Sequence, residues 1–292
     1  MSKRALTVVD LIELSAAERG WKPGLMLGDE TTLMNEYGAG RSVLRQAIRL
    51  AEHLGVASMR RGRSGGLTIA VPSPGPMALS LRIAWSQARL VPRAVERLED
   101  QINDWVTSAP PGAEVVGTAV LMASERYRVP APAPWKSDGT DRNPAKLGEQ
   151  IASQLLASIF DEPMDADVLG SEAQLMKTHH AGRAALREAV HILELHGAAA
   201  MQRGPGGGLL ILHKPTSGAI PRSLRAQLRS KGLCDDQICL VLNSLLVALP
   251  DNDSVPAAAA LRLGAQELRA ELAVQPPLEE AIDLRVAPSI GG

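Results

Sequence analysis

The apolar positions between residues 27 and 69 predict two short helices followed by a hairpin. Asp29 precedes the first apolar group, where its carboxylate can accept the free amides of a helical first turn. A second helix is predicted from Ser42, because its apolar residues recur at the i, i+3, i+4 and i+7 spacing of a core-facing stripe. That stripe consists of Leu44, Ala47, Ile48, Ala51 and Leu54. Residues 56–59 and 67–69 then predict two strands around a glycine-rich turn.

The same pattern returns 142 residues later in one ungapped match, which pairs residues 27–69 with residues 169–211. Nearly half of the paired positions are identical. The identical pairs include Glu30 and Glu172, Arg41 and Arg183, Arg45 and Arg187, and Gly62 and Gly204. Identity of this extent at one fixed register indicates an internal duplication.

A proline-rich stretch that starts at Pro130 separates the two copies and predicts a semi-stiff linker. Each copy is followed by a segment with helical patterning, and the residues after Pro276 predict a flexible tail. The expected organisation is copy one at 1–72, a helical segment at 73–129, a linker at 130–145, copy two at 146–214, a helical segment at 215–275 and a tail at 276–292.

Composition narrows the function classes. The 292 residues include 31 Lys and Arg against 32 Asp and Glu, a net charge of -1, which excludes a polybasic coat protein but not a local basic face. The two cysteines, Cys234 and Cys239, are too few for a disulfide scaffold and indicate a reduced intracellular protein. There is no signal-peptide core, and no uncharged apolar run approaches the roughly 18 residues of a membrane span. We therefore expect a cytoplasmic protein without membrane association.

The second predicted helix carries three arginines four residues apart on one face: Arg41, Arg45 and Arg49. Like charges at this spacing oppose one another by about 0.2–0.5 kcal/mol in an isolated helix. Solvation accounts for most such faces, but the turn that follows is also basic. It contains Arg60, Arg61, Gly62 and Arg63. We therefore expect the row to meet an anionic partner, and its burial or neutralisation by carboxylates would contradict this interpretation.

Helix, short turn, helix and basic hairpin are the pattern of a winged helix-turn-helix, whose second helix enters the major groove while the hairpin follows the DNA backbone. The predicted fold class is thus mainly α, with two winged helix-turn-helix domains. Each is expected to carry a small two-stranded wing and to precede a short helical segment.

Residues 27–69 resemble the DNA-binding domain of GntR-type bacterial transcription regulators, in the style of the FadR branch. The family's Leu-Pro-Ser-Glu-Arg start corresponds to residues 27–31, and its Val-Ser-Arg-Thr-Pro-Val-Arg-Glu-Ala core corresponds to residues 39–47. Its arginine-rich glycine wing corresponds to residues 60–66. The resemblance covers about 65 residues of each copy, roughly half of the chain.

The resemblance implies that Arg41 and Arg45 reach base edges or phosphates, that Ser42 holds a phosphate, and that Arg61 and Gly62 of the wing touch the groove. We expect the neighbouring arginines of the same helix and wing to contribute as well: Arg49, Arg60 and Arg63. The matching positions of copy two are Arg183, Arg187, Arg203 and Gly204.

Both copies depart from the family pattern. Thr31 and Ala173 replace the arginine that follows the family's glutamate, and Ala184 stands in copy two where copy one has Ser42. The charges also differ, because residues 1–70 carry ten basic and seven acidic side chains (10 − 7 = +3), whereas residues 146–214 carry six and eight (6 − 8 = −2). We expect copy one to bind DNA more strongly, since non-specific affinity follows phosphate neutralisation.

The leading hypothesis is a transcriptional regulator, and a repressor on family analogy. Its tandem units would form a covalent pseudo-dimer that reads half-sites about one helical turn apart, roughly 34 Å. A winged-helix scaffold for protein interactions and a replication-initiator-like DNA-binding protein remain alternatives. The expected partner is double-stranded DNA, while a homodimer and a small-molecule effector are left open.

No cofactor, metal or enzymatic activity is expected. The family's effector domain often holds a metal with an Asp and three His, yet residues 72–144 contain no histidine. The two cysteines lack further zinc ligands, and no nucleophile–base arrangement is visible.

Overall fold

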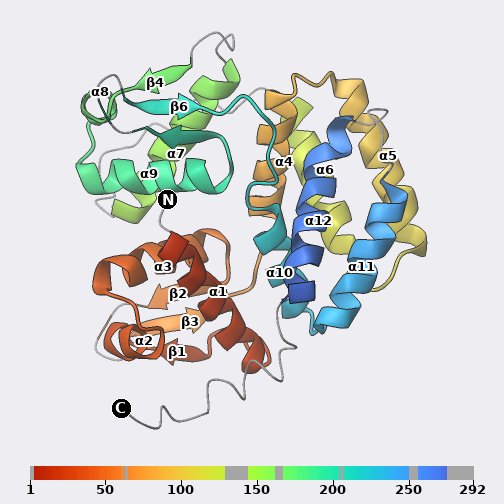
Figure 1. The fold of residues 1–292 in the computed structure, drawn as a ribbon, viewed down its shortest axis with the longest axis horizontal. Helices are drawn as coiled ribbons and strands as arrows, with labels where there is room; N and C mark the ends of the chain where they lie inside the picture. Colours follow the sequence, from red (N-terminus) through yellow and green to blue (C-terminus); the bar gives the residue numbers. More distant parts are fainter. Residues whose placement is uncertain are drawn as a thin grey trace.

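The computed structural model describes residues 3–60, 62, 65–128, 144–161, 167–202, 204, 207–249 and 256–274. These residues form twelve α-helices and two small antiparallel sheets, which confirms the mainly α class. Two small units lie on one side of the molecule and a helical bundle lies on the other (Figure 1). Unit one spans residues 3–69 and unit two spans residues 144–211. No helix in the described residues combines the length and apolar character that a membrane crossing requires.

Unit one begins with a long helix that the sequence pattern did not predict, and then follows the expected order. Its elements are α1 (Lys3–Glu18), β1 (Met26–Gly28), α2 (Glu30–Glu36), α3 (Arg41–His53), β2 (Ala57–Arg60) and β3 (Gly66–Ile69). The Asp29 carboxylate caps α2 by accepting from the Thr32 amide at 2.8 Å, as predicted, and this bond lowers the pKa of Asp29. Helix α1 packs against the apolar side of α3, where Leu44 is fully buried.

Unit two repeats this order. Its elements are α7 (Pro144–Asp161), β4 (Val168–Gly170), α8 (Glu172–Thr178), α9 (Arg183–Leu195), β5 (Ala199–Met201) and β6 (Leu209–Ile211). Ser171 and Gln174 form a reciprocal capping box at the start of α8. Helix α7 covers α9 as α1 covers α3.

Each sheet has three strands, so the expectation of a two-stranded wing is corrected. The predicted hairpin forms, with Ala57 opposite Ile69, and the short strand β1 pairs with the free side of β3. Unit two has the equivalent order β4, β6, β5. The third strand approaches so closely that a Cβ on Gly66 would lie 2.6 Å from the Gly28 carbonyl oxygen, and one on Gly208 would lie 2.7 Å from that of Gly170. Glycine is therefore required at both matched positions.

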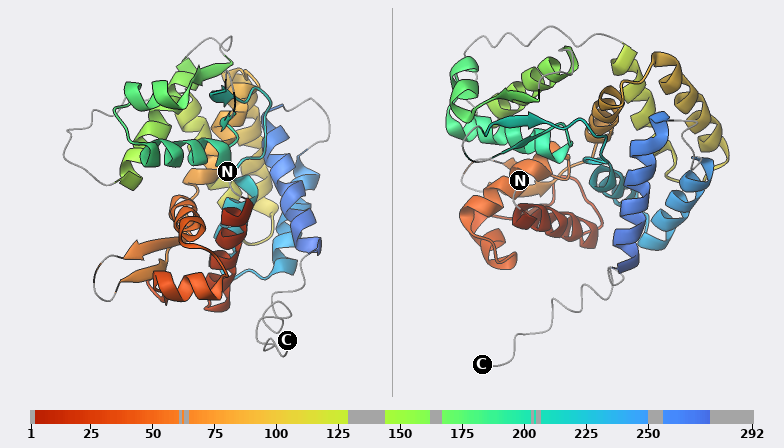
Figure 2. Two further views of the ribbon diagram at one scale, coloured as in Figure 1. Left: turned by 60° about the vertical axis from the view of Figure 1, so that its left-hand side comes forward. Right: turned by 45° about the horizontal axis from the view of Figure 1, so that its top comes forward.

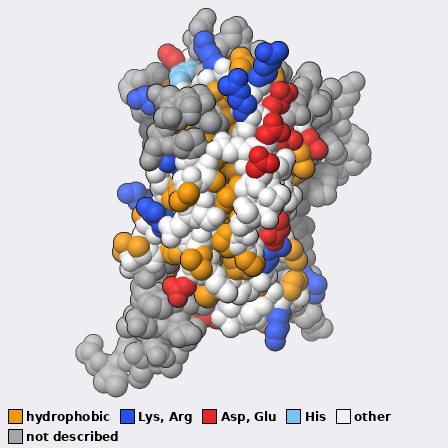
Figure 3. All heavy atoms as spheres, turned by 90° about the vertical axis from the view of Figure 1, so that its right-hand side faces the viewer, with side chains coloured by type: hydrophobic (Ala, Val, Ile, Leu, Met, Phe, Trp, Pro, Cys, Tyr) orange, Lys and Arg blue, Asp and Glu red, His pale blue; other side chains and the backbone are white. Residues whose placement is uncertain are grey.

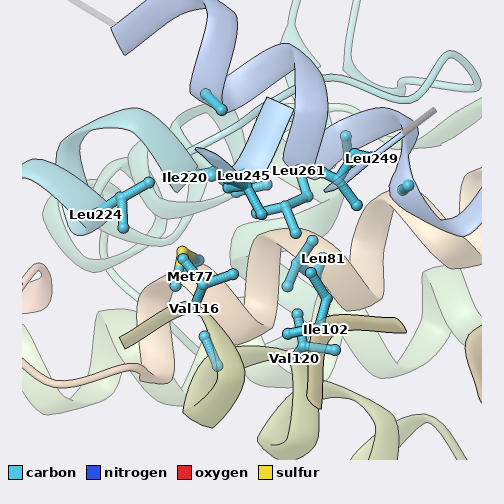
Figure 4. Packing of buried hydrophobic residues seen from close by; sticks show 14 of the residues in the cluster. Met77, Leu81, Ile102, Val116, Val120, Ile220, Leu224, Leu245, Leu249 and Leu261 are labelled. Atoms are coloured by element: carbon cyan, nitrogen blue, oxygen red, sulfur yellow. The ribbon is translucent and has the colours of Figure 1, made fainter. Parts of the chain in front are cut away.

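The helical segments that follow the two units form a single bundle. Its helices are α4 (Gly75–Gln87), α5 (Pro92–Ser108), α6 (Glu114–Arg128), α10 (Ile220–Ser230), α11 (Asp235–Ala248) and α12 (Ala259–Val274). Side chains from both segments interleave in one core, as Met77 and Leu81 of the first meet Ile220 and Leu261 of the second (Figure 4). The buried apolar residues of the two segments belong to one continuous core.

Each unit packs on the bundle helix that follows the other unit. The core of unit one includes Ala219 and Ala226, at the start and within α10, whereas the core of unit two includes Ile83 of α4. Each unit therefore packs on a helix from the other half of the chain, as in a domain-swapped dimer in which two subunits exchange an element. Figure 2 shows both units on the same side of the bundle, with the hairpin β2–β3 extending away from it.

A buried ion network fastens unit one to the bundle. Arg225 of α10 donates to Glu13 at 2.8 Å and to Asp10 at 2.7 Å, both on α1, and to Glu271 of α12 at 3.0 Å. The side chains of Arg225 and Glu13 are 3% and 1% exposed. Burial by itself lowers the pKa of Arg225, but the three carboxylates outweigh it and keep the guanidinium charged. At the matched position of α4, Ile83 makes apolar contacts with unit two instead.

Candidate nucleic-acid interface

Two of the predicted arginines meet one glutamate at the junction of α2 and α3. Arg45 donates through Nε and Nη2 to the two carboxylate oxygens of Glu30, at 2.9 and 3.1 Å. Arg41, at the first position of α3, lies 3.4 Å from the same carboxylate. The bond to Glu30 raises the pKa of Arg45. We call these three residues the Glu30 cluster.

Unit two contains the same arrangement at the matched positions. Glu172 lies 3.2 Å from Arg183 and 3.8 Å from Arg187, and we call these residues the Glu172 cluster. Each glutamate begins the shorter helix and each arginine pair begins the longer one, so the turn between the helices brings them together. Glu30 and Glu172 are identical residues at matched positions of the repeat, and this identity is the sequence signal that could have identified them as partners of the arginines.

The arginines of both clusters are exposed but are also paired with carboxylates. The side chains of Arg41 and Arg45 are 68% and 60% exposed, which agrees with a surface row. The expectation that carboxylates leave the row unpaired is wrong. A single carboxylate nevertheless cannot neutralise two guanidinium groups, and each cluster keeps a net charge of +1. Exposed pairs of this kind contribute only about 0–1 kcal/mol, so a polyanion can displace them. No hydrogen bond joins Nη1 of Arg45 to any described residue.

The third arginine of the row has a different partner. Arg49 forms an ion pair with Glu188 of α9, in unit two, and the Glu188 side chain is only 9% exposed. Helices α3 and α9 therefore lie side by side, in direct contact near their middles (Figure 1). This corrects the expectation that Arg49 continues the exposed row, whereas the half-site spacing of about one helical turn stays a prediction.

A second contact joins the carboxyl ends of the same helices. Nε2 of His53, the last residue of α3, lies 2.7 Å from Nε2 of His196, which follows α9. Nδ1 of His196 lies 2.8 Å from the Ser80 hydroxyl oxygen of α4, which accepts from the Ala219 amide before α10. Burial lowers the pKa of His53 to about 4, and burial, with a smaller effect of the neighbouring His53, lowers the pKa of His196 well below its ordinary value. The short contact accommodates one proton, so both rings are held neutral.

A cleft of about 250 Å³ separates α3 from α9 on their exposed side. Its lining consists of residue pairs related by the repeat: Ser42 and Ala184, Arg45 and Arg187, Gln46 and Glu188, Arg49 and His191, and Leu50 and Ile192. The cleft therefore lies on the pseudo-twofold axis between the two units. Ser42 is exposed in the first turn of α3, where the resemblance places a phosphate contact, and Ala184 offers no hydroxyl at the equivalent place.

The structure describes part of each wing, the hairpin that follows the second helix of each unit. Arg60 is exposed at the end of β2, and Gly62 and Gly204 take φ of 122° and 115°, a left-handed region that favours glycine at these hairpin tips. Arg61, Arg63 and Arg203 lie outside the described residues. Gln202 stands where unit one has Arg60.

Among the described residues, no three His, Cys, Asp or Glu side chains gather in a way that could hold a metal ion, and Cys234 and Cys239 are free thiols. Comparison of the chain with protein-family models, with curated protein sequences and with solved structures gives no match.

Proposed function

We propose that this chain is a cytoplasmic, DNA-binding transcriptional regulator of the GntR type, built from two winged helix-turn-helix units, and that it represses by occluding a promoter. The observation that carries the proposal is the exposed arginine pair at the amino end of α3, repeated at the amino end of the adjacent α9. The amino end of a helix attracts anions through its free amides and its dipole.

The proposed mechanism begins with non-specific attraction to phosphates. Arg41 and Arg45 then leave or share Glu30 as α3 enters the major groove, where a guanidinium can pair with the O6 and N7 atoms of guanine. Glu30 acts as a positioning residue, because its two-point bond with Arg45 orders the guanidinium before DNA arrives. Ser42 holds a phosphate, and the hairpin with Arg60 follows the backbone.

The test is selection of bound sequences from a library of random duplexes with the full-length chain, followed by titration of the enriched duplex at several salt concentrations. A regulator yields an enriched sequence whose affinity falls linearly with the logarithm of salt concentration. The absence of any mobility shift at low salt would refute DNA binding.

One observation favours a second candidate, a protein-interaction module. Helix α11 exposes Leu240 and Val247 on one side, seven residues apart, and the Val247 side chain is 88% exposed. Figure 3 shows hydrophobic side chains along the middle of this side of the molecule, with acidic side chains gathered along one edge. This side is part of the bundle, away from α3 and α9. Sedimentation velocity over a range of concentrations distinguishes this function, because a module of this kind self-associates without DNA and loses that property in Val247→Asp.

A further inference from the structure

Helices α3 and α9 are fastened to one another at two places. Arg49 pairs with Glu188 near the middle of the helices, and His53 contacts His196 at their carboxyl ends. Two helices joined at two separate points along their length cannot slide or pivot freely. The distance and angle between their amino ends, which carry the arginine pairs, are therefore set within the chain.

Glu188 is held in place from behind. A Cβ on Gly148 of α7 would lie 2.7 Å from the Cβ of Glu188 and 2.5 Å from its Cγ, so α7 packs directly against the base of this side chain. With that side closed, the carboxylate points across the pseudo-twofold axis to Arg49. The matched residue of unit one is Gln46, which is neutral, so the ion pair exists in one direction only.

The two helices carry the same arginine pairs but differ at three polar positions that line the cleft between them. The arginine pairs are the same, Arg41 with Arg45 and Arg183 with Arg187. The differing pairs are Ser42 and Ala184, Gln46 and Glu188, and Arg49 and His191. Burial also lowers the pKa of His191, so a neutral ring stands in unit two where unit one has a permanent cation.

We propose that the partner is a short, non-palindromic DNA site with two unequal half-sites at one fixed separation, and that the Arg49–Glu188 ion pair sets this separation. The proposal rests on the proposed function. A symmetric homodimer presents the same surface twice and therefore reads a palindrome. This chain is free of that constraint, because its two helices differ in sequence and are locked in a defined relation.

Glu188 is a positioning residue in this proposal and does not contact DNA. Pairing with it withdraws Arg49 from the phosphates, so that unit one presents two arginines on its second helix, as unit two does. Loss of the pair releases Arg49 and loosens α3 relative to α9. The expected result is a protein that binds DNA as well as before, or better, while tolerating a wider range of half-site separations.

The experiment uses the full chain and the duplex enriched from the random library. Three probes are compared: the enriched duplex, the same duplex with two base pairs inserted between its halves, and a palindrome made from its stronger half. The unmodified chain is expected to bind the inserted duplex about tenfold more weakly, the effect of losing one or two base contacts. It is also expected to bind the palindrome more weakly than the enriched duplex.

Glu188→Gln installs the residue found at the matched position of unit one, Gln46. Arg49→His installs the residue found at the matched position of unit two, His191. Each variant removes one member of the ion pair. If one variant fails to fold, the other still tests whether the ion pair sets the separation. Both are expected to reduce the insertion penalty to about threefold or less. Asp236→Asn on the exposed side of α11 removes the same charge as Glu188→Gln away from the interface, and it should keep the full penalty.

The outcomes separate the two proposals. If the unmodified chain enriches no sequence, the proposed function itself fails. If the chain enriches a palindrome, or if Glu188→Gln and Arg49→His keep the tenfold penalty, DNA binding stands and the inference of an asymmetric, fixed-spacing reader is overturned.

Discussion

Arg45 and Glu30 form a two-point ion pair between α3 and α2, and Arg187 and Glu172 repeat the approach in unit two at a longer distance of 3.8 Å. The two clusters differ in how firmly the glutamate positions the second arginine. Arg45 is aligned by two hydrogen bonds, whereas Arg187 makes only a loose contact with its glutamate.

Arg45→Ala should weaken binding to the selected duplex by about 1–3 kcal/mol if the guanidinium pairs with guanine. Arg187→Ala is the matched variant in unit two and should cost less, because unit two is the less basic copy and its arginine is less ordered. Fluorescence anisotropy with a labelled duplex measures both. Equal losses would contradict the inequality of the units, and an unchanged Kd for Arg45→Ala would count against the major-groove assignment.

The His53–His196 contact predicts a stability that falls in weak acid. The pKa of His53 is lowered from its ordinary value near 6.5 to about 4, so between these values the unfolded chain binds protons that the folded chain does not. The contribution is complete above about pH 6.5, and each pH unit below that costs about 1.4 kcal/mol for each such histidine until the folded pKa is reached. Urea unfolding at pH 7, 6 and 5 measures the slope.

His53→Gln should flatten that slope, since it removes one of the two titrating rings and the close contact between them. His180→Asn provides the control, because His180 is exposed and its positive φ of 48° suits asparagine. If His53→Gln and the unmodified chain lose stability in parallel from pH 7 to pH 5, the buried pair is not the source of the acid sensitivity.

Arg225 holds unit one on the bundle. Its removal leaves the buried Glu13 carboxylate with Arg229 of α10, which lies farther away at 3.3 Å. Arg225→Ile installs the residue found at matched position 83 and should destabilise the chain by about 3–5 kcal/mol, as expected when one member of a buried ion pair is lost. The double variant with Glu13→Leu should recover much of this loss, because the buried Glu13 carboxylate is removed and the buried Arg229 keeps its ion pair with Asp235 at 2.8 Å. Urea denaturation measures both, and a cost below 1 kcal/mol for Arg225→Ile would show that the network adds little.

The close approach at Gly66 predicts a localised effect on the sheet of unit one. Gly66→Ala forces a Cβ to within 2.6 Å of the Gly28 carbonyl, so β1 must separate from β3, at a cost of about 1–3 kcal/mol. Gly40→Ala is the matched control for stability, since a Cβ there meets no atom within 4 Å and the φ of −66° suits any residue. Thermal unfolding compares the two, and equal Tm values would contradict the steric argument.

Local features of the fold were accessible from the sequence because they depend on neighbours in the chain. The stripe through Leu44 and Leu54, the Asp29 cap and the glycine-rich turn around position 62 each follow from helix geometry or turn chemistry. Helix α1 was missed, although its apolar residues Val8, Val9 and Ile12 are buried, because the charged residue Glu13 interrupts its apolar face and is buried only through its distant partner Arg225. The third strands were missed because three residues are too few to show a period.

The candidate site also has a part that the sequence predicted and a part that it did not. Arg41 and Arg45 were identified correctly as exposed residues of one helix face, since the spacing of four settles that relation. Their carboxylate partner, Glu30, was not identified. Helical periodicity shows which side of a helix is apolar, but it does not show which residues the preceding turn places next to that helix.

By itself, the sequence determined that the chain is duplicated, that each copy has two short helices before a hairpin, and that an arginine pair begins each second helix. Only the tertiary structure decided that the two helical segments share one core, that each unit packs on the other half, and that Arg49 belongs to Glu188 rather than to the exposed row. The reason is physical. Periodicity and capping act over a few residues of chain. These contacts join residues that are far apart in the chain, so their partners depend on how all the packed surfaces fit together.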